Sequence, residues 1–139
     1  APPSRYGWSE PVNLYAGSSH RLARADMVAR ADLAATPLLT MERSNGMRDI
    51  VEAALARGRA SFAMAALESD NMFEIMAALR DGAGSFAAFG PLARDLGRMS
   101  GIRRLALDMP LPAIEIRQAV GADAARKPAV DALAEFLFL

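Results

Sequence analysis

Two segments of the chain place apolar residues at intervals of three and four positions, a spacing that gives a helix one apolar face. One helix is therefore expected within residues 42–58 and another within residues 68–82. Gly58 and Gly82 follow the last apolar position of each segment, where glycine commonly ends a helix. The apolar stripes of the two helices are Met47, Ile50, Val51, Ala54 and Leu55, and Met72, Ile75, Met76 and Leu79.

Short apolar runs between turn-forming residues predict strands. The run at 113–120 alternates apolar and polar residues, so one of its faces is expected to meet water. Further helices are expected at 32–34, 91–97 and 127–139. The expected strands are residues 12–16, 37–41, 61–67, 85–89, 102–107 and 113–120, and the expected core residues of the last helix are Val130, Leu133, Ala134 and Leu137. Because strand and helix alternate, the pattern predicts an α/β domain with a largely parallel, doubly wound sheet.

Three of the expected strands lead directly into a helix start, in residues 42–48, 67–71 and 88–91. In an open α/β sheet, ligands bind at the carboxyl ends of the strands, where the helices begin. The unpaired backbone N–H groups of a helix start form a site for an anion. These three corners are therefore candidate ligand-binding loops.

The first corner combines hydrogen-bond donors with positive charge. Ser44 and Asn45 supply side-chain donors, and Arg43 and Arg48 supply charge, which together suit a carboxylate or a phosphate. Ser44 and Asn45 are also residue types that cap helices, so capping alone is the competing interpretation.

The other two corners favour different chemistry. Asp70 would repel an anion but would bind a hydroxyl or an amine, while Phe89 offers a ring face to the apolar body of a ligand. Ser69 and Asp70 are equally suited to capping the helix that follows. Gly84, between the second helix and the strand at 85–89, is expected to serve the turn of the backbone.

The composition limits the function classes. Lys and Arg together number 16, as do Asp and Glu together. The resulting net charge of zero argues against the binding of nucleic acid by this segment. The absence of cysteine excludes disulfides and thiolate metal sites, and no apolar stretch approaches the roughly 18 residues of a membrane span. The first ten residues lack the apolar core of a signal peptide, so a cytoplasmic location is expected.

Catalysis finds little support in the sequence. His20 is the one histidine, which rules out metal sites built on histidine clusters. A serine–histidine relay would use His20 with Ser18 or Ser19, but no nucleophile elbow of the Gly-x-Ser-x-Gly type occurs. A small hydrolase or transferase, with His20 and Glu68 as candidate groups, is the weaker hypothesis. We expect no enzyme activity, no cofactor and no metal.

Taken in order, several segments resemble the effector-binding domain of LysR-type transcriptional regulators. The resemblance spans about 125 residues, and no single motif in it is highly specific. Arg21 stands where the family usually has proline after the histidine, and Gly90 stands where leucine is more common. The segments that carry the resemblance are EPVNLYAGSSHRLA (10–23), RADLAATPLLTMERSNGMRDIVEAALARG (30–58), MAALRDGAGSFAAFGPLARDL (76–96), RRLALDMP (103–110), AIEIRQAV (113–120) and PAVDALAEFL (128–137).

The resemblance implies a sensor with two α/β lobes of the periplasmic-binding-protein type (type 2) and a small-molecule effector in the cleft between them. Residues 1–139 are then a partial effector-binding domain, with a complete second lobe at about 21–113 and, at 114–139, a crossing strand and a C-terminal helix returning to the first lobe. The first half of the first lobe and the N-terminal helix-turn-helix of the family have no counterpart here, so DNA is expected to be bound only through that missing part.

By position, the family's cleft contacts fall on the same three corners that the strand-end argument selects. The implied effector-binding residues are Ser44, Asn45, Gly46, Ser69, Asp70, Asn71, Phe89 and Gly90. The anion site and the apolar ring suggest a small organic or aromatic acid as effector. The resemblance also implies a homo-oligomer. A free-standing solute-binding domain of the same architecture is the alternative function.

Overall fold

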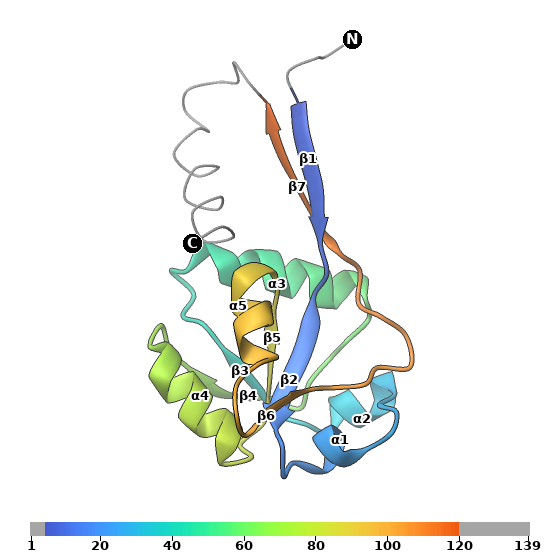
Figure 1. Cartoon of the computed structure of the whole chain (residues 1–139), viewed down its shortest axis with the longest axis vertical. Helices are drawn as coiled ribbons and strands as arrows, with labels where there is room; N and C mark the ends of the chain where they lie inside the picture. The colour runs from blue at the N-terminus through green and yellow to red at the C-terminus, as the bar shows by residue number, and fades with distance from the viewer. Residues whose placement is uncertain (1–4, 120–139) are drawn as a thin grey trace.

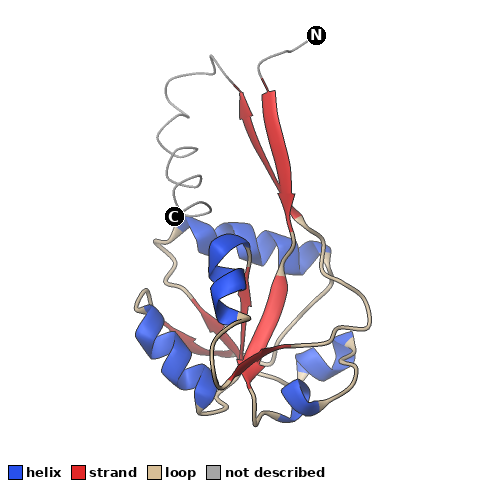
Figure 2. Ribbon diagram, viewed as in Figure 1, coloured by secondary structure: helices blue, strands red, loops and turns tan. Residues whose placement is uncertain are grey.

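The computed structural model of the 139-residue chain describes residues 5–119. Strands and helices alternate along most of this part, and helices flank the sheet (Figure 2). The strands are β1 (Arg5–Glu10), β2 (Asn13–Gly17), β3 (Leu38–Thr40), β4 (Ala65–Glu68), β5 (Ser85–Ala88), β6 (Ile102–Arg104) and β7 (Ile114–Ala119). The helices are α1 (Arg21–Arg24), α2 (Arg30–Ala34), α3 (Gly46–Arg57), α4 (Met72–Arg80) and α5 (Gly90–Leu96).

Among the described residues, five strands form one mixed sheet in the order β4-β3-β5-β2-β6. Strand β3 is parallel to β4 and to β5, whereas β2 is antiparallel to β5 and to β6. Four strands therefore point the same way and β2 runs against them. The expected α/β fold with a mainly parallel sheet is confirmed. The exception follows from the chain path, because β2 enters the sheet at the edge where the parallel strands end.

Two apolar layers cover the two faces of this sheet. Helices α1, α2 and α3 pack on one face, where Leu14 and Ala16 of β2 point. Helices α4 and α5 pack on the other face, together with Tyr15 of β2. This alternation along β2 buries both of its faces, as expected for a strand inside an α/β sandwich.

Strands β1 and β7 form a separate two-stranded ribbon that extends away from the five-stranded sheet (Figure 1). They pair antiparallel, with Arg5 opposite Ala119 at one end and Glu10 opposite Ile114 at the other. Residues 11 and 12 alone separate β1 from β2, so the ribbon and the sheet are joined at the edge where β2 begins.

Several boundaries differ from the sequence prediction. Strand β4 begins at Ala65 rather than at residue 61, because Phe62 packs on the core from an irregular segment. Strand β6 ends at Arg104, and the chain then leaves β2 to form an isolated parallel bridge with Val28. The expected helix at 127–139 lies outside the described residues.

Candidate functional site

The three predicted corners lie at one edge of the sheet, because β4, β3 and β5 are parallel neighbours and each corner follows one of them. A side chain joins two of the corners directly. The Glu42 N–H donates to Asp70 Oδ1 over 3.1 Å, and Asn45 Nδ2 lies 3.5 Å from the same oxygen. We call residues 42–46, 69–71 and 89–90 the rim.

Each of the two longer helices begins at the rim with an asparagine cap. Asn45 Oδ1 accepts from the Met47 N–H over 2.9 Å at the start of α3, and Asn71 Oδ1 accepts from the Phe73 N–H over 2.9 Å at the start of α4. Asn45 is thus one of the two residues, Ser44 and Asn45, that the sequence offered as caps of α3. The prediction for α4 was wrong by one position, since Asn71 caps it instead of Ser69 or Asp70.

The hydroxyl groups of the rim differ in whether they already have a hydrogen-bond partner within the described part of the chain. The Ser69 hydroxyl is buried, donating to Glu74 Oε2 and accepting from the Asn71 N–H over 3.0 Å. Ser44 is exposed, and its hydroxyl has no hydrogen-bond partner among residues 5–119. Gly46 is exposed as well, with no atom within 4 Å of the position that a Cβ would take. Open space and an available donor therefore meet at the start of α3.

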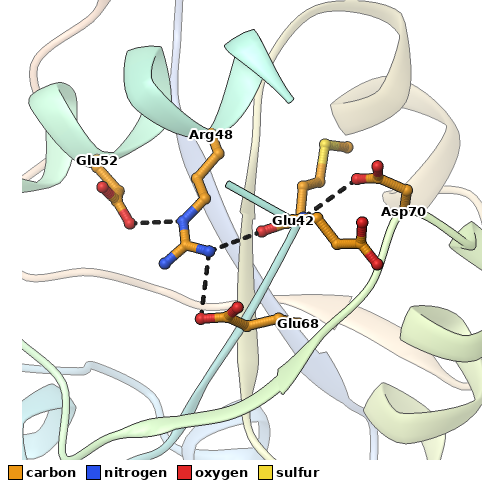
Figure 3. A network of polar contacts seen from close by, with 6 residues as sticks. Glu42, Arg48, Glu52, Glu68 and Asp70 are labelled. Atoms are coloured by element: carbon orange, nitrogen blue, oxygen red, sulfur yellow. Dashed lines mark hydrogen bonds and ion pairs between the residues drawn. The ribbon is translucent and has the colours of Figure 1, made fainter. Parts of the chain in front are cut away.

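Arg48 does not supply free charge to the rim, contrary to the sequence prediction. Its side chain is 6% exposed, with Nε 2.8 Å from Glu52 Oε1 and Nη1 3.2 Å from Glu68 Oε1 (Figure 3). Nη1 also donates to the Met41 carbonyl over 3.1 Å. The hydrogen bond with Glu52, and a further one with Glu68, raise the pKa of Arg48 above its ordinary value. Two carboxylates thus neutralise this guanidinium, which ties α3 to β3 and β4.

An apolar cavity of about 30 Å³ lies beneath the rim, between α3, the sheet and the start of α5. Phe89 lines it and is 1% exposed, so its side chain is buried in the interior. Thr40 also lines it, and Thr40 Oγ1 is buried with no hydrogen-bond partner within the described part of the chain. Other residues that line the cavity are Met41, Met47, Val51, Leu55 and Leu92.

Gly90, the residue that departs from the family pattern, has a positive φ of 66° and is buried. L-residues with a Cβ rarely adopt this conformation, so glycine suits the turn from β5 into α5. Pro91 follows at the start of the helix, as expected from its fixed φ.

His20, one of the two candidate groups of the enzyme hypothesis, lies at the opposite end of the strands from the other, Glu68. It follows the end of β2, which runs against β4, whereas Glu68 ends β4 at the rim. His20 caps α1, where its Nδ1 accepts from the Leu22 N–H over 3.1 Å. The two groups are therefore not arranged to act on one substrate.

We expect the cap at His20 to make stability depend on pH. Burial, and then the charge of Arg21, lower the pKa of His20 below its usual value. Nδ1 accepts a hydrogen bond only when it is unprotonated. The stabilisation is therefore full above about pH 6.5, the usual histidine pKa, and is lost as the pH falls through the lowered value. His20→Asn keeps an acceptor without titrating there. Thermal unfolding between pH 5 and 8 should show a weaker pH dependence in this variant, and equal slopes would contradict the assignment.

Two further absences hold for residues 5–119. No group of three or more His, Asp or Glu side chains there is arranged to hold a metal ion. No helix in this part is both long enough and apolar enough to cross a membrane.

The fold that carries the rim is that of a lobe of the periplasmic-binding-protein type, with the rim at the ends of its parallel strands. The model of the LysR substrate binding domain family matches residues 4–138. The chain belongs to this family, the effector-sensing domain of LysR-type regulators. Comparison with curated proteins gives no match.

Several solved structures share this fold. The regulatory domain of CcmR from Synechocystis PCC6803, in complex with 2-PG, aligns with a TM-score of 0.61 at 17% identity, over 97% of this chain and 68% of that one. The reduced form of OxyR gives 0.60 at 19% identity, over 98% and 64%. The effector binding domain of QuiR, in complex with shikimate, gives 0.58 at 13% identity, over 97% and 64%. The chain thus spans about two thirds of these proteins.

Proposed function

We propose that the chain senses a small-molecule effector for a LysR-type transcriptional regulator, and that the rim with its cavity forms one wall of the effector site. The observation that carries this proposal is the convergence of three loops, distant in sequence, on one sheet edge, where Asp70 joins two of them. The likeness to domains solved with bound 2-PG and shikimate supports a small polar organic ligand.

The chemistry of the wall favours an effector with an apolar part and a polar head. The apolar part would approach the cavity, where the buried Thr40 hydroxyl has no hydrogen-bond partner among the described residues. The head would lie at the start of α3, where the Ser44 hydroxyl is a donor at the positive end of the helix dipole, because the Met47 N–H already donates to Asn45. An organic acid fits this donor. Its carboxylate would bind through hydrogen bonds and the helix dipole, because Arg48 is already neutralised.

The effector would act by stabilising one arrangement of the regulator over another, since a ligand shifts an equilibrium only through a difference in affinity. The full-length cytoplasmic protein would act as an oligomer and contact DNA through its helix-turn-helix. In this proposal the domain performs no reaction, which agrees with the separation of His20 from Glu68.

Ser44→Ala is expected to weaken the effector response without unfolding the domain. Asn45 supplies the cap of α3, so the exposed Ser44 hydroxyl is not needed for the helix. Loss of one neutral hydrogen bond costs about 0.5–1.5 kcal/mol, or roughly two- to twelve-fold in the effector concentration at half induction. A reporter assay with the full-length regulator, paired with thermal unfolding, measures both quantities.

Ser100→Ala offers a matched control, because Ser100 is also exposed but lies near the end of the sheet remote from the rim. Its induction curve should match that of the native protein. An unchanged curve for Ser44→Ala would remove Ser44 from the effector site, and a loss of induction that follows loss of stability would assign it a structural role.

A further inference from the structure

A second concave site lies beside α5, on the side of this helix away from the apolar cavity. It is a groove of about 410 Å³ between α5, β2 and β6. Leu92 of α5 lines the cavity, whereas Ala93, Arg94 and Gly97 line the groove, so the helix lies between the two spaces. We call this space the arginine groove.

Charge is unevenly distributed in the arginine groove. Arg94, Arg98 and Arg104 line it together with one carboxylate, that of Glu10, which leaves a formal net charge of +2 (three positive groups minus one negative). Arg94 Nη1 lies 3.8 Å from Glu10 Oε2, a long ion pair. Among residues 5–119, the guanidinium groups of Arg98 and Arg104 have neither an ion-pair nor a hydrogen-bond partner.

Polar groups also form the floor of the groove. The buried Tyr15 hydroxyl donates to the Ala93 carbonyl over 2.8 Å and fixes α5 against β2. Burial raises the pKa of Tyr15, while Asn13 and Arg104 act in the opposite direction. Asn13 and Arg104 line the groove together with Tyr15. The groove thus holds fixed polar groups beneath its arginines.

We propose that the arginine groove binds a small anion with two negative charges, held by Arg98 and Arg104 with Arg94 at its border. Guanidinium groups match the oxygen pairs of carboxylates and phosphates, so the ligand is a phosphate group or a dicarboxylate. Without such a ligand, three like charges around one concavity repel each other. This site does not depend on the effector site at the rim.

The location suggests what the anion does. Glu10 is the last residue of β1 and is buried where the ribbon meets the sheet. An anion that attracts Arg94 competes with Glu10 for this guanidinium. Occupation of the groove therefore weakens the Arg94–Glu10 ion pair between α5 and the ribbon, and so acts at the base of the β1–β7 ribbon.

Titration calorimetry of the 139-residue chain tests the site, with inorganic phosphate and malonate as probes at constant ionic strength. We expect saturable binding of one equivalent of at least one probe. Charge-assisted hydrogen bonds contribute about 1.5–3 kcal/mol, so Arg98→Ala or Arg104→Ala should weaken binding by about ten- to a hundred-fold. The preferred probe decides between the phosphate and the dicarboxylate.

Arg103→Ala is the matched control for charge. Arg103 precedes Arg104 in β6 but points to the other face, where its Nη1 lies 3.5 Å from the Ala23 carbonyl. It removes the same charge and should leave binding within about two-fold, as should Ser44→Ala at the rim. All four residues are exposed, so the variants should fold with native circular dichroism. Binding of neither probe, or equal losses in Arg103→Ala and Arg104→Ala, would overturn the proposal.

Discussion

Phe89→Ala is expected to lower the free energy of unfolding by about 3–5 kcal/mol, the usual cost of truncating a buried phenylalanine. Phe89 is 1% exposed and belongs to the core between the sheet and helices α1–α3. It also lines the cavity of about 30 Å³, so removal of the ring would enlarge this cavity. Urea unfolding of the variant and of the native chain measures the difference.

Phe73→Ala is the control for this change, because Phe73 is 80% exposed on α4. The same truncation there should change the unfolding free energy by no more than about 0.5 kcal/mol. Equal losses of stability in the two variants would mean that the ring of Phe89 is not buried as the structure shows.

The helices and strands could be predicted from the sequence because the spacing of apolar residues and the position of glycine within each segment indicate its structure. The apolar stripe of α4 places Ile75 and Leu79 in the core, and both are fully buried. Gly58 ends α3 as its position after the stripe indicated. Parallel strands order their ends at one edge, so the meeting of the three corners also followed from the α/β pattern.

Contacts between distant segments could not be predicted in this way. Arg48 looks like a free cation in sequence, but it is neutralised by Glu68, which lies 20 residues further along the chain at the end of strand β4. Its i,i+4 partner Glu52 was visible in the sequence and was the one available signal. Glu10 is likewise far from Arg94 in the chain, so its place in the arginine groove emerges only when the fold is known.

The two proposed sites lie on either side of helix α5 and differ in chemistry. At the rim, strand ends meet helix starts capped by asparagine beside an apolar cavity. In the arginine groove, an exposed helix face and an edge strand provide charge above a polar floor. Helix α5 borders both, through Leu92 on one side and Arg94 on the other. A small shift of this helix would therefore change the geometry of both sites.

Gly84→Ala is expected to destabilise the fold by about 1–3 kcal/mol or more, the cost of overfilling a packed interior. A Cβ at this position would lie 2.4 Å from the Pro37 carbonyl oxygen and 3.0 Å from its carbon. Neither atom can turn away as a side chain would, because the same oxygen accepts from the Ser85 N–H over 3.0 Å where β5 meets β3. Thermal and urea unfolding measure the loss.

Gly46→Ala gives the opposite expectation from the same substitution, because no atom lies within 4 Å of the added Cβ. Alanine also reduces the freedom of the unfolded chain, so stability should stay unchanged or rise by up to about 1 kcal/mol. Equal destabilisation at both positions would mean that flexibility rather than close approach decides the cost. A selective loss at Gly84 instead shows that this glycine lets β5 reach β3, which brings the third corner of the rim beside the first.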